Sequence, residues 1–264
     1  LSKVELKYSY HNSLLQHCKK NKIEFLSTGF DLDSIDFLSS LKLKRFKIPS
    51  GEITNYPYLK RIANLKKPTI LSTGMASKSE IKQALSILLQ NGLKKKLITI
   101  LHCTSEYPAP YKDLNLRFMQ QIKKDFNIQV GYSDHSLGIE IPIAASALGA
   151  CIIEKHITLN KNLDGPDQKC SIEFEDLKKM VDSIRNVEIA LGTNKKIISA
   201  NEKDTKKLVR KFIVAKTNIV KGTTFTDENL TVKRSGSGIN AIFWNKIIGK
   251  KAKKNFKIDE IIKK

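Results

Sequence analysis

The chain has 264 residues, of which 41% are hydrophobic, and this length accommodates one large domain, or one large and one small domain, with a real core. It has no run of about 18 apolar residues and no apolar segment at its start, which argues against a membrane span and a signal peptide. Its four cysteines lack CxxC spacing, so we expect reduced thiols in a cytoplasmic protein. The net charge of +21 comes nearly all from dispersed lysines without interleaved aromatic residues, which favours a solvated basic surface over a specific nucleic-acid site.

Six short apolar runs, rich in β-branched residues, are predicted as buried strands. They occupy residues 24–27, 45–48, 69–72, 98–101, 129–132 and 151–154. Their spacing of roughly 20 to 30 residues is that of βα units, with helices in between. The pattern predicts a parallel α/β fold, and by itself it leaves both a doubly wound sheet and a TIM barrel open.

Two of the intervening helices have clear sequence signals. Residues 77–80 have the form of a capping box, an apolar stripe follows, and Asn91-Gly92 ends the helix. The second helix stops at Gly192 and is expected to face the core along one stripe. The members of that stripe are Phe174, Leu177, Val181, Ile184, Val187 and Leu191.

The pattern changes near residue 195, which predicts a domain boundary. We assign residues 1–194 to the α/β domain, residues 195–208 to a polar linker and residues 209–264 to a small unit. Strand-like pieces at 212–215 and 230–232, with turns at 221–222 and 235–238, indicate that this unit is mostly β.

Polar side chains follow each predicted strand. In chain order they are Thr28; Lys47, Ser50 and Glu52; Ser72 and Thr73; His102, Thr104, Ser105 and Glu106; Ser133, Asp134 and His135; and Glu154, Lys155 and His156. Because sites in parallel α/β folds lie at the carboxyl ends of strands, we expect these groups around one mouth.

Two kinds of ligand suit these groups. One lysine with several hydroxyls suits an oxyanion such as phosphate, and His135 and His156 could share a divalent metal. Simpler interpretations remain open, since a strand-end serine often caps the next helix and Glu52 could pair with a lysine. His102 ends a buried run and is interpreted as a core histidine.

Several motifs, in order, resemble the bacterial sialic acid (N-acetylneuraminate) synthase family. They are residues 46–57, 71–75, 101–108, 131–135, 154–156 and 165–167. The tail, with residues 219–222 and 232–234, resembles that family's antifreeze-like (SAF) domain. The resemblance implies a TIM (β/α)8 barrel followed by this mostly-β cap domain. It also implies condensation of phosphoenolpyruvate with N-acetylmannosamine, giving N-acetylneuraminate and phosphate with Mn²⁺ or Mg²⁺. Legionaminic or pseudaminic acid synthesis is the alternative.

The resemblance also implies roles for individual residues. Phosphoenolpyruvate would be held by Thr28, Lys47, Ser50, Ser72, Ser105 and Ser133. His135 and His156 would hold the metal, and these two residues with Glu52 would act in catalysis. Glu52, Tyr107 and Asp167 would face the sugar. Arg234 would reach the partner subunit's site in a domain-swapped homodimer.

The chain departs from the family pattern in a few places. It is expected to lack the barrel's first two strands, together with a catalytic glutamate and a phosphate-binding lysine. Gly29 and Ser235 stand where the family usually has proline, which increases the freedom of the unfolded chain. A truncated, inactive fragment is therefore a second interpretation. A different phosphoenolpyruvate-condensing barrel is a third, which the cap domain disfavours, and a nucleic-acid-binding module is the fourth.

Overall fold

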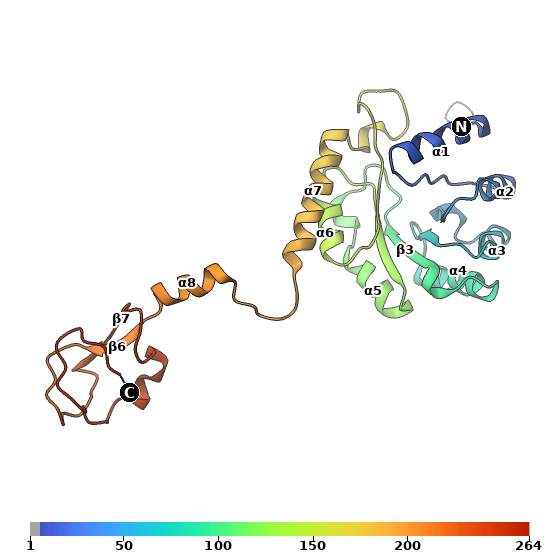
Figure 1. The fold of residues 1–264 in the computed structure, drawn as a ribbon. Coiled ribbons are helices and arrows are strands. Elements are labelled where there is room, and N and C mark those ends of the chain that lie inside the picture. Colours follow the sequence, from blue (N-terminus) through green and yellow to red (C-terminus); the bar gives the residue numbers. More distant parts are fainter. Residues whose placement is uncertain (1–5, 264) are drawn as a thin grey trace. The chain divides into compact units, whose positions relative to one another are not determined.

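The computed structural model describes residues 6–263 and divides into two compact units. The first unit ends at Gly192 and the second begins at Thr193 (Figure 1). No helix within residues 6–263 is both long and apolar enough to cross a membrane.

A parallel sheet forms the centre of the first unit. Among residues 6–263 it has five strands in sequential order: β1 (Phe46–Ile48), β2 (Thr69–Ser72), β3 (Ile98–Cys103), β4 (Gln129–Asp134) and β5 (Ile153–Lys155). The sheet curls, and helices surround its outer side (Figure 1). The unit is therefore an α/β half-barrel, which confirms the predicted parallel α/β fold and agrees with the barrel that the family resemblance implies rather than with a doubly wound sheet.

Two helices precede the first strand of this unit, and one helix follows each of the five strands. They are α1 (Tyr8–Lys20), α2 (Leu32–Ser40), α3 (Tyr56–Asn64), α4 (Lys78–Gln90), α5 (Arg117–Phe126), α6 (Glu140–Ala147) and α7 (Phe174–Leu191). Short 3-10 turns occupy η1 (Ser50–Glu52), η2 (Lys95–Leu97), η3 (Tyr111–Asp113) and η4 (Gln168–Cys170). The capping box at the start of α4 is confirmed, because the Ser77 side chain accepts from Glu80 N and the Glu80 side chain accepts from Ser77 N.

Two predictions for this unit are wrong in part. Residues 24–27 form no strand, because no strand within the described chain pairs with them and a strand needs a hydrogen-bonded neighbour. Instead, Arg45 donates to both carboxylate oxygens of Glu24 at 2.6 and 3.0 Å. Along α7, the buried residues are Met180 and Ile184, which pack against the β5 and α6 region. Phe174, Val181 and Leu191, which were predicted to face the core, are exposed.

The two faces of the sheet differ in chemistry, since side chains alternate across a strand. The outer face packs Ile48, Leu71, Ile100 and Val130 into a core with the helices, and each of these is at most 1% exposed. Their neighbours along the strands, among them Lys47 and Ser72, point to the inner face. The sheet therefore has a dry outer face and an inner face that becomes polar at the carboxyl ends of the strands.

The second unit is small and mostly β. Its strands β6 (Phe212–Ala215) and β7 (Leu230–Lys233) are antiparallel and confirm the predicted pieces. A 3-10 segment, η5 (Ala241–Lys246), follows β7. The core of this unit includes Ile213, Leu230, Phe256 and Ile262. The predicted linker holds a helix, α8 (Ala200–Val209), because Ser199 and Glu202 form a second capping box there.

Candidate active site

Lys47 lies on β1 with its side chain directed across the inner face of the sheet. Its Nζ is 2.9 Å from Glu154 Oε2 on β5, although four steps of a flat sheet would separate these strands by about 19 Å. The contact is possible because the sheet curls. Ser133 Oγ on β4 donates to Glu154 Oε1 at 2.7 Å, so Glu154 joins the lysine to one of the predicted hydroxyls.

The carboxylate of Glu154 is held in its charged form. Burial by itself would raise the pKa of Glu154, but the positive charge of Lys47 and the hydrogen bonds from Ser133 and Lys47 outweigh it and lower that pKa. Lys47, only 8% exposed, is thus a buried cation with one anionic partner. Lys47 Nζ can bind a second anion if it divides its hydrogen bonds between that anion and Glu154.

A group of short side chains lies at the ends of β1, β2 and β3. Ser50 Oγ accepts from Gly74 N at 2.9 Å and lies 3.3 Å from Cys103 Sγ. A Cβ placed on Gly74 would come within 2.0 Å of Ser105 Oγ, so Ser50 and Ser105 both border this glycine. We call Lys47, Ser50, Ser72, Gly74 and Ser105 the anion side of the site.

Ser72 adds an observation that points to a ligand. Its side chain is buried, and its Oγ has no hydrogen-bond partner. Buried hydroxyls are rarely left unpaired, because desolvation without a partner is costly. A ligand oxygen at the anion side would satisfy it.

The carboxyl ends of the strands form a rim, and the anion side is one half of it. His135 and His156 lie on the other half, which we call the imidazole side. Their ring centroids are 5.3 Å apart, and Tyr107 packs 4.1 Å from the first ring and 5.5 Å from the second. Asp167 Oδ2 lies 3.6 Å from His156 Nδ1. Four residues predicted from the sequence are therefore brought together here.

His135 has a fixed tautomer. Its Nδ1 is 2.6 Å from the carbonyl oxygen of Thr104, and a carbonyl only accepts, so Nδ1 carries the proton and Nε2 keeps its lone pair. Burial lowers the pKa of His135, although the Thr104 carbonyl opposes this. The ring is thus kept neutral with one nitrogen free, as a metal ligand requires.

The imidazole side fits a divalent metal with an incomplete set of protein ligands. The two imidazoles could contribute two nitrogen ligands to a divalent metal, and water or substrate oxygens, which Mn²⁺ and Mg²⁺ prefer, would fill the other positions. No group of three or more His, Cys, Asp or Glu side chains suited to a metal occurs within residues 6–263. The donor set therefore suits an ion that keeps open positions, rather than a closed structural site.

Three predicted site residues make none of the contacts described for the anion side and the imidazole side. Thr28 is half-buried after residues 24–27. Glu52 lies on η1, where its Oε2 accepts from Asn55 Nδ2 at 2.6 Å. Arg234 is exposed on the second unit. Their roles stay predictions.

Two features were missed in the sequence. Glu154 was noted as a strand-end residue but was not assigned to the site, and its position opposite Ser133 in the β4–β5 register identifies it only once the strands are paired. Gly74 carries no side chain to notice. His102, by contrast, is the core histidine expected, since its Nε2 is 2.8 Å from the Leu114 carbonyl oxygen on the outer face.

Comparisons with known proteins give matches for both units of the chain. Residues 1–196 match the NeuB family, and residues 210–264 match the SAF domain. The N,N'-diacetyllegionaminic acid synthase of Campylobacter jejuni is 52% identical over 263 residues, which are 100% of this chain and 79% of that protein. The pseudaminic acid synthase of the same species is 35% identical over 97% of this chain and 74% of its own length.

A solved structure shares the fold. The N-acetylneuraminic acid synthetase of Leptospira borgpetersenii superposes with a TM-score of 0.71 at 37% identity, covering 76% of this chain and 70% of its own. The chain therefore aligns with several sugar acid synthases along most of its length.

Proposed function

Since this chain belongs to the NeuB family and carries a SAF domain, we propose that it condenses phosphoenolpyruvate with a diacetamido sugar to form a legionaminic-type acid. The observation that carries the proposal is the division of one rim into two parts. A buried lysine and a buried serine hydroxyl without a partner lie on one part, and two imidazoles in edge contact lie on the other.

The anion side would bind phosphoenolpyruvate. Lys47 would contact its phosphate or carboxylate as a point charge, and Ser50, Ser72 and Ser105 would donate neutral hydrogen bonds. Thr28 and Ser133 would complete this set. Glu154 keeps the net charge near Lys47 low, so that a positive charge developing on the substrate is not repelled by an excess of cations.

The imidazole side would bind Mn²⁺ or Mg²⁺ through His135 and His156. Bound there, the ion would act as a Lewis acid on the aldehyde oxygen of the sugar. His135 keeps its Nε2 lone pair available without a change of tautomer, and Tyr107 packs against both rings on one side. Glu52 and Asp167 are proposed to orient the sugar's hydroxyl and acetamido groups.

The reaction balances without a further reactant. Carbon 3 of phosphoenolpyruvate forms a bond to the aldehyde carbon, whose oxygen takes up a proton. Water adds at carbon 2, and inorganic phosphate leaves with the carbon–oxygen bond electrons as the keto acid forms. The residues of this chain position both substrates for this step, which is the main contribution that two-substrate enzymes make.

The choice of sugar follows the relatives. The sequence resemblance favoured N-acetylmannosamine first, and the diacetylated legionaminic product as the alternative. Identity of 52% to the legionaminic acid synthase, against 37% to the neuraminic acid synthetase, supports the alternative. We also propose that Arg234 acts on the partner subunit's site in a domain-swapped homodimer.

A direct assay tests the proposal. The purified protein is incubated with phosphoenolpyruvate, Mn²⁺ and either the diacetamido hexose or N-acetylmannosamine, and phosphate release and product mass are measured. We expect a nine-carbon diacetamido keto acid to form faster than N-acetylneuraminate. Faster turnover of N-acetylmannosamine would reject the sugar assignment, and phosphate release without a condensed product would reject the reaction.

A further inference from the structure

A buried ion pair lies directly behind the imidazole side, and the proposed chemistry does not use it. Lys155 Nζ is 2.5 Å from Asp134 Oδ2, and the two side chains are 4% and 0% exposed. Every other ion pair among residues 6–263 has a partner that is at least 39% exposed. This pair is therefore unusual in being shielded from water on both sides.

The pair stands in register with the two histidines. Asp134 and Lys155 are opposite each other on β4 and β5, and each immediately precedes one histidine of the imidazole side. One position earlier, Ser133 and Glu154 are also opposite and hydrogen-bonded. Because side chains alternate across strands, the Ser133–Glu154 contact joins β4 and β5 on the inner face, and the Asp134–Lys155 contact joins them on the outer face.

The same carboxylate also fixes the backbone on both sides of His135. Asp134 Oδ1 accepts from Ser136 N at 3.0 Å and from Ser136 Oγ at 2.7 Å. Lys155 Nζ donates in addition to the Ser136 carbonyl oxygen at 2.6 Å. His135 is thus the middle residue of a closed turn that Lys155 ties to β5.

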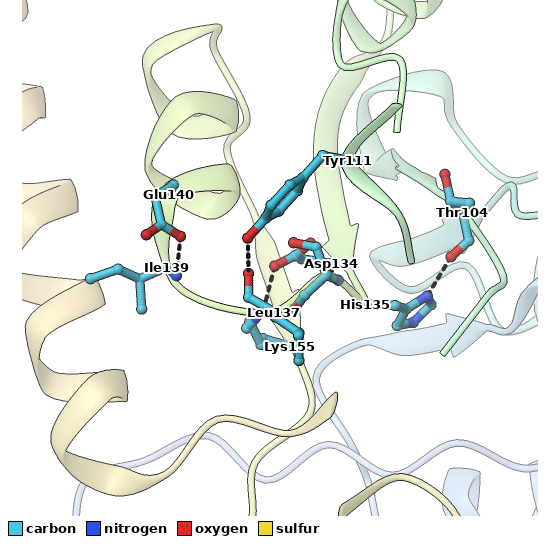
Figure 2. Close-up of polar contacts among 9 residues, drawn as sticks. Thr104, Tyr111, Asp134, His135, Leu137, Ile139, Glu140 and Lys155 are labelled. Carbon is cyan, nitrogen blue, oxygen red and sulfur yellow. Dashed lines mark hydrogen bonds and ion pairs between the residues drawn. The ribbon is translucent and has the colours of Figure 1, made fainter. Parts of the chain in front are cut away.

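Figure 2 shows how this turn and the ring contacts combine. The His135 ring extends toward Thr104, whereas Asp134 and Lys155 meet on the other side of the backbone. Tyr111 Oη donates to the Leu137 carbonyl oxygen at 3.3 Å, one residue beyond the turn. The ring orientation and the backbone position of His135 are therefore set by separate groups.

We propose that Asp134 and Lys155 are positioning residues that hold His135 and His156 at the separation needed to share one divalent cation. This inference rests on the metal site of the proposed function. Burying two charges is a poor way to gain stability, and groups behind metal ligands commonly tune metal affinity by their control of ligand geometry. The pair would do so through the strand ends, without touching the ion or either substrate.

The test measures Mn²⁺ affinity, by the electron paramagnetic resonance signal of free Mn²⁺, on the full chain. Asp134→Asn keeps an acceptor for Ser136 but removes the charge. A double variant, Asp134→Asn with Lys155→Met, removes both charges, leaves neither one unpaired and keeps an acceptor for Ser136, so we expect it to fold even where the single variant does not. Two controls are Asp182→Asn, which breaks an exposed ion pair with Lys178 at 2.6 Å, and Ile100→Val, which loosens the core elsewhere.

We expect the dissociation constant for Mn²⁺ to rise about tenfold in Asp134→Asn and in the double variant, with circular dichroism showing folded protein. Both controls should bind as the unchanged protein does. Unchanged Mn²⁺ affinity in the double variant would overturn the positioning role alone. Equal weakening in Ile100→Val would also overturn it, because a general loss of stability would then explain the effect. Failure of the unchanged protein to bind Mn²⁺ would overturn the metal site and this inference together.

Discussion

The two sides of the rim are built on different principles, although they lie on one sheet. The anion side consists of short side chains and a glycine, and at least one of its hydroxyls has no partner. On the imidazole side, the His135 ring is fixed by Thr104 and its backbone by Asp134 and Lys155. The anion side leaves the Ser72 hydroxyl without a protein partner, whereas the imidazole side uses its hydrogen bonds to fix the position of a histidine. Variants on the two sides should therefore affect different measurements.

The largest expected effect follows removal of the buried cation on the anion side. Lys47→Met should raise the KM for phosphoenolpyruvate about ten- to hundredfold, because one charge-assisted contact contributes about 1.5–3 kcal/mol. Mn²⁺ affinity should change by less than about twofold, since the histidines do not touch Lys47. Steady-state kinetics and Mn²⁺ titration check both values, with the exposed Lys44→Met as the matched control. An unchanged KM would remove Lys47 from the substrate site.

The second prediction adds a methyl group inside the anion side. In Gly74→Ala the new Cβ would lie 2.0 Å from Ser105 Oγ and 2.9 Å from Ser50 Oγ, so both hydroxyls must move. We expect a loss of about 1–3 kcal/mol in unfolding free energy and a raised KM for phosphoenolpyruvate.

The matched control for that variant is Gly51→Ala, whose added Cβ meets nothing within 4 Å. It should change the free energy of unfolding by less than about 0.5 kcal/mol. Urea unfolding and the KM measurement separate the two variants. If Gly74→Ala behaves like its control, the close packing around Ser50 and Ser105 is not what shapes the site.

The third prediction compares Ser72, whose hydroxyl we assign to substrate binding, with Ser77, whose hydroxyl caps a helix. Ser72→Ala should leave stability unchanged or slightly increased, because its Oγ has no partner to lose, but it should raise the KM for phosphoenolpyruvate several-fold. Ser77→Ala removes the N-cap of α4 and should cost about 0.5–2 kcal/mol of stability with an unchanged KM. Thermal melting and kinetics on both variants check this; a stability loss in Ser72→Ala would mean that its hydroxyl is already bonded.

The smallest effect concerns a histidine that lies outside the rim. Burial lowers the pKa of His102 from its usual 6.5, and the hydrogen bonds of its ring to the Leu114 and Asn115 backbone oppose this only in part. Below pH 6.5 the unfolded chain therefore binds more protons at this position, so the stability present above pH 6.5 falls as the pH decreases toward the folded-state pKa.

His102→Gln keeps a donor for the Leu114 carbonyl but does not titrate. The loss of unfolding free energy between pH 7.5 and pH 5.5 should be smaller in this variant than in the unchanged protein. His17→Gln, which alters an exposed histidine of α1, should show the full loss. Urea titrations at both pH values check this, and identical losses in all three proteins would contradict a neutral buried His102.

Much of the fold could be predicted from sequence, because apolar runs and capping residues act locally. The run at β3 is long and begins with three β-branched residues, and the capping box of α4 is complete within four residues. Residues 24–27 also contain adjacent apolar residues but form no strand, since pairing depends on a neighbour and not on the segment itself. The face of α7 that is buried likewise depends on α6, which composition cannot reveal.

The site was predictable in its residue types but not in its pairings. Consecutive polar residues such as Ser133 and Asp134 look equivalent in the sequence, and only the β4–β5 register decides which faces the rim and which lies behind it. The same register places Glu154 opposite Ser133, and the curl of the sheet brings Lys47 to it. Strand pairing, which joins residues far apart in the chain, therefore carries the information that the motifs lack.

The most direct test of the divided rim is a crystal structure of the protein soaked with Mn²⁺ and phosphoenolpyruvate. We expect an anomalous Mn²⁺ peak between the rings of His135 and His156, at about 2.2 Å from one nitrogen of each, and phosphoenolpyruvate within hydrogen-bond distance of Lys47 and Ser72. Mn²⁺ away from both rings, or phosphoenolpyruvate bound away from Lys47, would contradict the assignment of the two sides.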